Sequence, residues 1–250
     1  MQGKVASQLP RVVVVSENSI QDIHTDMGVD LDRMRLVPVG VDPDLFRPID
    51  GVERVPGRLI TTASADVALK GLAYLVEAMA KLRADGHDLT LTIIGRPKPG
   101  KSMDLIEQYG LMPYIDFVSG VTDARIVELY SEAELAVVPS LYEGFSLPAI
   151  EAMCSGTPLV ATDGGALPEV TGADGETVFR CRKGDAESLA ATIRHALANP
   201  EARARVGAAG RQRVVERWTW RRCAELTIEQ YREVLAMPQN ISKLAANGRI

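Results

Sequence analysis

The sequence predicts an α/β fold in which a doubly wound, Rossmann-like parallel sheet is covered by helices. Two observations lead to this prediction. Short apolar runs rich in β-branched residues alternate with segments of helical periodicity, and several of these runs end directly in Gly, Ser or Pro. In open α/β sheets, ligands bind beyond the carboxyl ends of the strands. The functional residues are therefore expected just after the apolar runs.

The elements follow in chain order. Strand patterns occupy residues 12–16, 35–38, 59–63, 89–94, 115–118, 135–138, 159–162 and 177–181. Helical patterns occupy residues 70–85, 102–109, 123–133, 148–155, 186–199, 200–217 and 220–235. The helix at 148–155 is apolar on nearly every side, which predicts that it is buried all round.

The chain divides into unequal parts. Residues 41–57 hold three prolines and two glycines with little periodicity, so they are the expected linker. Residues 58–235 contain six strand patterns and form a complete doubly wound domain. Residues 1–40 contain two strands and one helix, too little to bury a core of their own. Residues 236–250 are small and polar and are expected to form a flexible tail.

Composition limits the classes of function. The net charge is -5, so the chain offers no overall attraction to nucleic acid. No apolar run is long enough for a membrane span or a signal peptide, which predicts a cytoplasmic protein. The three cysteines are widely spaced and form no Cys-x-x-Cys pair, so neither a disulfide framework nor a zinc site is expected.

Two carboxylates, Glu143 and Glu151, flank a predicted strand-to-helix junction in otherwise apolar sequence. Glu151 is the only charged residue of its helix. An ionised carboxylate in such surroundings costs several kcal/mol, as an order of magnitude, unless it is paired or hydrogen-bonded. A ligand with neighbouring hydroxyl groups, such as a ribose, supplies two donors to its two oxygens. We therefore expect a ligand at this junction.

The segment 139–162 resembles the donor-binding signature of the retaining nucleotide-sugar glycosyltransferases of family 4. The two glutamates lie eight positions apart, as that motif requires, and Lys70-Gly71 opens a helix in the way the lysine of the family does. The resemblance extends over most of the chain. It implies the C-terminal domain of a B-type glycosyltransferase, with residues 1–40 as a remnant of the N-terminal acceptor domain.

The resemblance also implies the site. Lys70 would hold the diphosphate of a UDP-, GDP- or ADP-sugar, Glu143 the transferred sugar, and Glu151 the ribose. Gly144, Phe145, Ser146 and Leu147 form the turn whose backbone N–H groups suit phosphate and sugar oxygens at a helix start. In the family, the leaving phosphate helps to accept the proton of the acceptor on the same face. Lys70 and Glu143 are thus the expected catalytic residues, with neither cofactor nor metal.

One position departs from the family pattern. An arginine commonly stands six residues before the lysine and completes a cationic clamp, but this chain has Ser64 there. Losing a charge-assisted hydrogen-bond donor that points at the developing negative charge weakens the stabilisation of that charge by about 2–4 kcal/mol. Either another cation, such as Arg96, replaces this arginine, or turnover is poor.

Three other patterns in the sequence allow alternative assignments. Residues 95–102 fit the Walker A expression of a P-loop NTPase, but Pro97 and Pro99 lack the N–H groups that such a loop needs. Two Asp-x-Asp pairs, at 30–32 and 42–44, arise easily by chance and are assigned no metal. The Trp- and Arg-rich residues 217–222 suit either a peripheral membrane contact or, preferably, tryptophans packed under the last helix.

A rival from another class is a non-catalytic subunit that binds the donor. It would need a partner chain, or the missing N-terminal domain, to bind the acceptor. The acceptor itself stays undefined at the level of sequence.

Overall fold

The computed structural model describes residues 2–63 and 67–238. The first part contains α1 (Gln2–Ala6), β1 (Val12–Val14), α2 (Glu17–Met27) and β2 (Met34–Leu36). The larger part begins with β3 (Val55–Thr62), α3 (Leu72–Ala84), β4 (Thr90–Ile94), α4 (Lys101–Gln108), β5 (Ile115–Val118), α5 (Asp123–Glu132) and β6 (Ala133–Val138). It continues with α6 (Leu147–Cys154), β7 (Leu159–Thr162), α7 (Leu167–Thr171), β8 (Phe179–Cys181), α8 (Ala186–Ala198), α9 (Pro200–Arg217) and α10 (Trp220–Ala236).

Six strands form one parallel sheet in the order β5-β4-β3-β6-β7-β8. The first strand of this set, β3, lies in the middle, and the chain winds outward from it in one direction and then in the other. This is the order of the doubly wound Rossmann fold, so the predicted fold class is confirmed. The point where the winding reverses lies between β3 and β6, which pair with each other in parallel.

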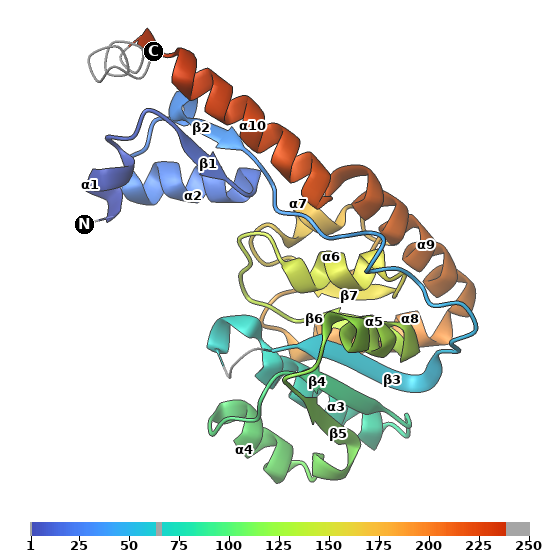
Figure 1. Cartoon of the computed structure of the whole chain (residues 1–250). Coiled ribbons are helices and arrows are strands. Elements are labelled where there is room, and N and C mark those ends of the chain that lie inside the picture. Colours follow the sequence, from blue (N-terminus) through green and yellow to red (C-terminus); the bar gives the residue numbers. More distant parts are fainter. Residues whose placement is uncertain (1, 64–66, 239–250) are drawn as a thin grey trace.

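Alternate residues of the central strands face two separate cores. Leu59 belongs to a core formed with α3, α4 and α8, whereas Ile60 belongs to one formed with α5 and α6. The same alternation continues along β6 and β7. Both faces of the sheet are thus buried, which explains why the strands are apolar runs without polar alternation. Figure 1 shows the helices on the two sides of this sheet.

Several helices begin at side chains that cap their first free N–H groups. Thr122 caps α5, Asp185 caps α8 and Thr219 caps α10, each accepting from the N–H group three residues later. Helix α9 begins with Pro200, whose missing N–H group is not needed at a first helical position. The boundaries of these helices therefore follow from local sequence.

The first part of the chain forms a two-stranded parallel sheet, β1-β2, and lies beside the far end of α10 (Figure 1). Arg11 pairs with Glu233 of α10 at 2.7 Å, and the backbone of Val41 bonds with the residues around Thr219. Gly40 is required at this crossing, because an added Cβ would lie 2.2 Å from the carbonyl carbon of Thr219. The last helix thus ties the first 40 residues to the larger part.

Some elements differ from the sequence-based expectation. Strand β3 begins at Val55 and so takes up the last residues of the expected linker, and the short helices α1 and α7 were not predicted. The packing expected for the tryptophans is wrong for Trp220, which is 50% exposed, while Trp218 is buried. The described residues contain no helix with the length and apolar character of a membrane span. The expected tail lies largely outside the described residues.

Candidate functional site at the strand ends

Lys70 and Glu143 meet at the point where the winding of the sheet reverses. Lys70 ends a short 3-10 helix, Ala68–Lys70, that follows β3, and Glu143 lies in the loop that follows β6. The Nζ atom of Lys70 lies 2.9 Å from Oε1 and 3.1 Å from Oε2 of Glu143. Ligands of this fold bind outside the carboxyl ends of the strands at such a point. Two residues singled out from the sequence are thus brought together there.

The loop that carries Lys70 is held against the end of β6 by its backbone. Leu141 donates its N–H to the carbonyl oxygen of Leu69 at 2.8 Å. Gly71 adopts φ 68°, and an added Cβ would lie 1.9 Å from the carbonyl oxygen of Pro139. Only glycine therefore allows this approach. The position of the Lys70 ammonium group depends on it.

Glu143 is buried, with 8% of its surface exposed. Besides Lys70, it accepts a hydrogen bond from the hydroxyl of Ser140 at 2.7 Å. Its carboxylate is therefore both paired with a cation and hydrogen-bonded to a hydroxyl group, as buried carboxylates require. Ser140 was not predicted from the sequence, although a hydroxyl residue three positions before Glu143 could have been identified as a hydrogen-bond donor to it.

The glycines at 164 and 165 support the same loop. An added Cβ at Gly164 would lie 2.6 Å from the carbonyl oxygen of Ser140, and one at Gly165 2.3 Å from that of Glu143. Ala166 donates its N–H to this same oxygen of Glu143 at 2.8 Å. These two glycines therefore allow the chain after β7 to pass close to the loop of Glu143.

The turn from Gly144 to Leu147 leads into α6 with an unusual backbone. Ser146 has φ 93° and is the only non-glycine residue with positive φ in the described part of the chain. Its hydroxyl is buried without a hydrogen-bond partner among the described residues. A strained residue with an unpaired buried hydroxyl points to a functional role.

Backbone donors gather at the same turn. The N–H groups of Phe145, Ser146 and Leu147 donate no hydrogen bond to any described residue. They lie at the start of α6, where the helix dipole favours negative charge. The side chain of Phe145 does not share this role, because it is buried edge-to-face on Trp218 with ring centroids 5.4 Å apart. The turn thus offers N–H donors to an anion.

Glu151 lies in the second turn of α6 and is half-buried. Burial, followed by the charge of Asp123, raises the pKa of Glu151 to about 7. Unlike Glu143, its carboxylate forms no ion pair or hydrogen bond with any residue that the structure describes. Among the described residues, the ionised form therefore lacks a partner.

Tyr130 is a neighbour of Glu151 that sequence reasoning missed. Its ring is buried, and its hydroxyl lies 3.2 Å from that of Thr62 at the end of β3. Burial, followed by the charge of Glu151, raises the pKa of Tyr130. Tyr130 therefore stays neutral and links the end of β3 to α5.

Helix α2 of the first part also contacts the site loop. Ser16 and Ser19 donate their hydroxyl groups to the carbonyl oxygen of Gly144, at 2.6 and 3.2 Å. The carboxylate of Glu169 accepts from the backbone N–H groups of Glu17 and Asn18 at the start of α2. These contacts join residues far apart in sequence, which is why pattern analysis did not find them.

The remaining sequence-based candidates lie elsewhere. Ser64 falls outside the described residues. Arg96 is exposed in the loop after β4 and forms no ion pair with a described residue. In the Walker-like segment, Gly95 donates its N–H to the carbonyl oxygen of Val118 at 2.7 Å, so its first N–H group belongs to the sheet. Lys101 lies 5.8 Å from the ring centroid of Tyr74.

The Asp-x-Asp pairs serve local structure. Asp42 accepts a hydrogen bond from the backbone N–H of Asp44 at 2.9 Å, and Asp30 pairs with Arg33 at 3.2 Å. Within residues 2–63 and 67–238, no group of three or more His, Cys, Asp or Glu side chains is arranged to hold a metal ion.

Comparison with known proteins identifies relatives of this chain. The MMP alpha-(1->4)-mannosyltransferase of Mycolicibacterium hassiacum is 43% identical over 237 residues, covering 94% of this chain and 57% of that protein. Sucrose-phosphate synthase of Thermosynechococcus elongatus is 27% identical, with a TM-score of 0.80, covering 94% of this chain and 61% of that structure. The chain spans about half the length of the curated relatives it matches.

A third similarity shows the fold alone. Anabaena HepE, solved in complex with UDP and glucose, superposes with a TM-score of 0.83 at 19% identity, covering 93% of this chain and 66% of that structure. Residues 52–213 match the family described as glycosyl transferases group 1, a range that contains Lys70, Glu143 and Glu151. This chain therefore belongs to the glycosyl transferases group 1.

Proposed function

We propose that this chain supplies the donor-binding half of a retaining, metal-independent family 4 glycosyltransferase, which transfers a sugar from a nucleotide sugar to an acceptor. The observation that carries the proposal is the meeting of Lys70 and Glu143 where the winding of the sheet reverses. Free N–H groups at the start of α6 lie in the next residues of the same loop. One short segment thus offers a cation, a carboxylate and backbone donors.

Each group has a role that follows from its chemistry. The ammonium group of Lys70 and the N–H groups of Ser146 and Leu147 suit the diphosphate, whose negative charge grows as the sugar leaves. Glu143, held by Lys70 and Ser140, accepts hydrogen bonds from the hydroxyl groups of the sugar. Glu151, which lacks a described partner, accepts from the two hydroxyl groups of the ribose. Catalysis then rests on positioning and electrostatics.

The proposal is tested by isothermal titration of the chain with UDP-, GDP- and ADP-sugars, followed by transfer assays. Mannosyl donors belong in the panel because the 43% identical relative is named a mannosyltransferase. Retention is read from the anomeric configuration of the product by NMR, and metal independence from the rate in the presence of a chelator. Donor binding without transfer or donor hydrolysis would assign this chain the binding role alone.

The donor site itself is tested by substitution. Glu151→Ala is expected to abolish nucleotide-sugar binding, whereas Lys101→Ala in the Walker-like segment is expected to leave it unchanged. Magnesium-dependent ATP binding that is lost in Lys101→Ala would contradict the proposal and favour a P-loop activity.

A further inference from the structure

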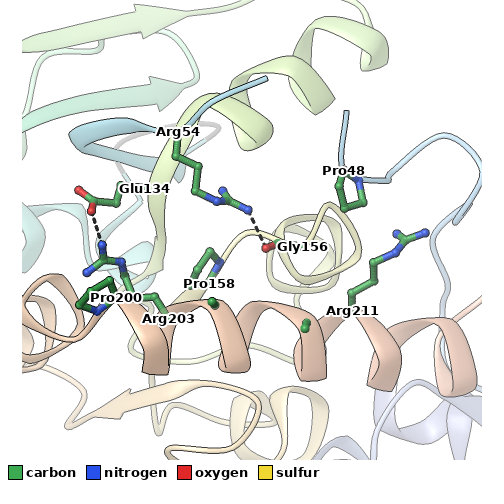
Figure 2. Close-up of a pocket in the computed structure, with 10 residues that line it drawn as sticks. Pro48, Arg54, Glu134, Gly156, Pro158, Pro200, Arg203 and Arg211 are labelled. Carbon is green, nitrogen blue, oxygen red and sulfur yellow. Dashed lines mark hydrogen bonds and ion pairs between the residues drawn. The ribbon is translucent and has the colours of Figure 1, made fainter. Parts of the chain in front are cut away.

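A cavity lies at the amino ends of the strands, on the side of the sheet edge opposite Lys70 and Glu143. It has a volume of about 630 Å³ and is bounded by Pro48 and Arg54 of the linker, by the loop before β7, and by α9 (Figure 2). Glu134 is the second residue of β6, and Pro158 directly precedes β7. Because these strands run parallel, the cavity lies at their amino ends, whereas Lys70 and Glu143 follow carboxyl ends. It is therefore separate from the proposed donor site.

Three arginines reach this cavity, and backbone carbonyl oxygens anchor each of them. Arg54 donates to the carbonyl oxygens of Ala133 and Gly156, each at 2.7 Å. Arg211 donates to the carbonyl oxygen of Phe46 at 3.0 Å. Arg203, the third, is held in the same way at the end of α8. A carbonyl oxygen fixes a guanidinium group in place but does not cancel its charge.

The positive charge of the cavity is only partly balanced. Arg203 donates to Oε1 of Glu134 at 2.6 Å, while Oε2 of Glu134 accepts from the N–H of Gly57 at 2.6 Å. Arg54 and Arg211 form no ion pair with a described residue. Burial, followed by the charge of Arg203, lowers the pKa of Arg54, as expected for cations placed close together. Of the three arginines, only Arg203 is paired with a carboxylate among the described residues.

The guanidinium groups still have hydrogen bonds to give. Each guanidinium group has five N–H donors, and each forms at most three hydrogen bonds with described residues. Figure 2 shows Arg203 and Arg211 projecting from the same side of α9, with Arg54 approaching from the linker. Ala204 and Ala208 of α9 leave the space between them open. The donors are held ready, so little side-chain entropy is lost when an anion binds.

The geometry points to a second binding site in this cavity, which takes a small dianion of the phosphomonoester class. Planar, anchored guanidinium groups suit the paired oxygens of a phosphate. The volume exceeds that of inorganic phosphate alone and leaves room for a small organic part. Since Arg54 belongs to the linker and Arg203 and Arg211 belong to α9, the anion would join the linker to the larger domain.

The test places a carboxylate in the cavity without removing any anchored arginine. In Ala208→Glu the new charge competes with the anion, and Ala208→Gln is the matched neutral control, because Ala208 is exposed on α9. Binding of inorganic phosphate and of glycerol 3-phosphate is measured by thermal shift and titration, against sodium chloride of equal ionic strength. We expect Ala208→Glu to weaken binding about tenfold or more and Ala208→Gln to leave it unchanged.

Lys70→Ala separates the two sites, since binding at the cavity should persist in that variant. Loss of phosphate binding in Lys70→Ala, with equal binding by the two Ala208 variants, would overturn the inference in favour of the donor site. A thermal shift with phosphate that is no larger than the shift with sodium chloride would also overturn the inference. If Ala208→Glu does not fold, the pair Ala204→Glu and Ala204→Gln, one turn earlier on α9, decides in the same way. Failure of the donor proposal leaves this outcome untouched, because no nucleotide sugar is used.

Discussion

The ammonium group of Lys70 lies 2.9 Å from Oε1 of Glu143, although 73 residues separate the two along the chain. The pair joins the loop after β3 to the loop after β6, where the winding of the sheet reverses. A donor molecule bound there would meet a cation and a carboxylate that already hold each other in position.

The first prediction concerns the pair itself. In Lys70→Met, the buried Glu143 keeps only the hydroxyl of Ser140 as a partner among the described residues. We therefore expect the free energy of unfolding to fall by about 1–3 kcal/mol. The loss is smaller than for a fully buried pair because the side chain of Lys70 is 32% exposed. Adding Glu143→Gln should restore most of the stability but not donor binding. Urea unfolding of the two single variants and the double variant measures the coupling. Additive losses would contradict it.

The second prediction concerns stability and pH at Glu151. Its pKa of about 7 in the folded protein lies above the ordinary value of 4.5, so the folded state holds this proton more tightly than the unfolded state. The stabilising proton is present at low pH and is lost as the pH rises through 7. This contribution amounts to about 3 kcal/mol at most.

Glu151→Gln removes this dependence. We expect the variant to be more stable than the wild type at pH 8 and about equal to it at pH 4. Unfolding curves at both pH values measure the difference. Glu107→Gln, at an exposed position on α4 that forms no ion pair with a described residue, controls for the loss of a charge elsewhere. A constant difference across this range would show that the pKa of Glu151 is not raised.

The third prediction concerns protons released on donor binding. If ribose hydroxyl groups donate to the ionised carboxylate as proposed, binding should lower the pKa of Glu151 and release a fraction of a proton near pH 6.5. Donor affinity should therefore rise between pH 6 and pH 8. Titration calorimetry in buffers of different ionisation enthalpy counts the protons. The same release in Glu151→Gln would assign it to another group.

The fourth prediction separates strain from hydrogen bonding at Ser146. With φ 93°, the residue is better suited to glycine, so Ser146→Gly should raise the free energy of unfolding by roughly 1 kcal/mol. Ser146→Ala keeps the strain and removes the same hydroxyl group. If this hydroxyl binds the donor, both variants lose donor affinity to a similar degree, and the glycine variant gains more stability than the alanine variant. Unchanged affinity in both would leave the hydroxyl without a role in binding.

The fifth prediction concerns the support of the Glu143 loop. A Cβ at residue 165 would lie 2.3 Å from the carbonyl oxygen of Glu143, so Gly165→Ala should displace this loop and lower both stability and transfer. Gly175 is the matched control, because it has a similar φ of 73° but no atom within 4 Å of an added Cβ. Gly175→Ala should cost only the conformational penalty, about 1 kcal/mol. Equal effects of the two substitutions would contradict the steric argument.

Much of the fold follows from local sequence. The eight apolar runs became the eight named strands, because β-branched residues that are buried on both faces leave few alternatives. Helix α9 begins and ends where its pattern predicted, whereas the five-residue helix α7 was missed, because so short a segment shows little periodicity. Trp220 was misjudged because a tryptophan in sequence carries no sign of which face of α10 it occupies.

The sequence by itself determined that the chain is a doubly wound α/β protein with Lys70, Glu143 and Glu151 placed near strand ends. It could do so because periodicity and turn residues act over a few neighbouring positions. Only the tertiary structure decided that Lys70 pairs with Glu143, that Glu151 has no described partner, and that α10 returns to the first part of the chain. Only the tertiary structure, likewise, brings the anchored arginines together at the cavity beside the amino ends of the strands. Such relationships depend on distances between residues remote in sequence, which local patterns do not encode.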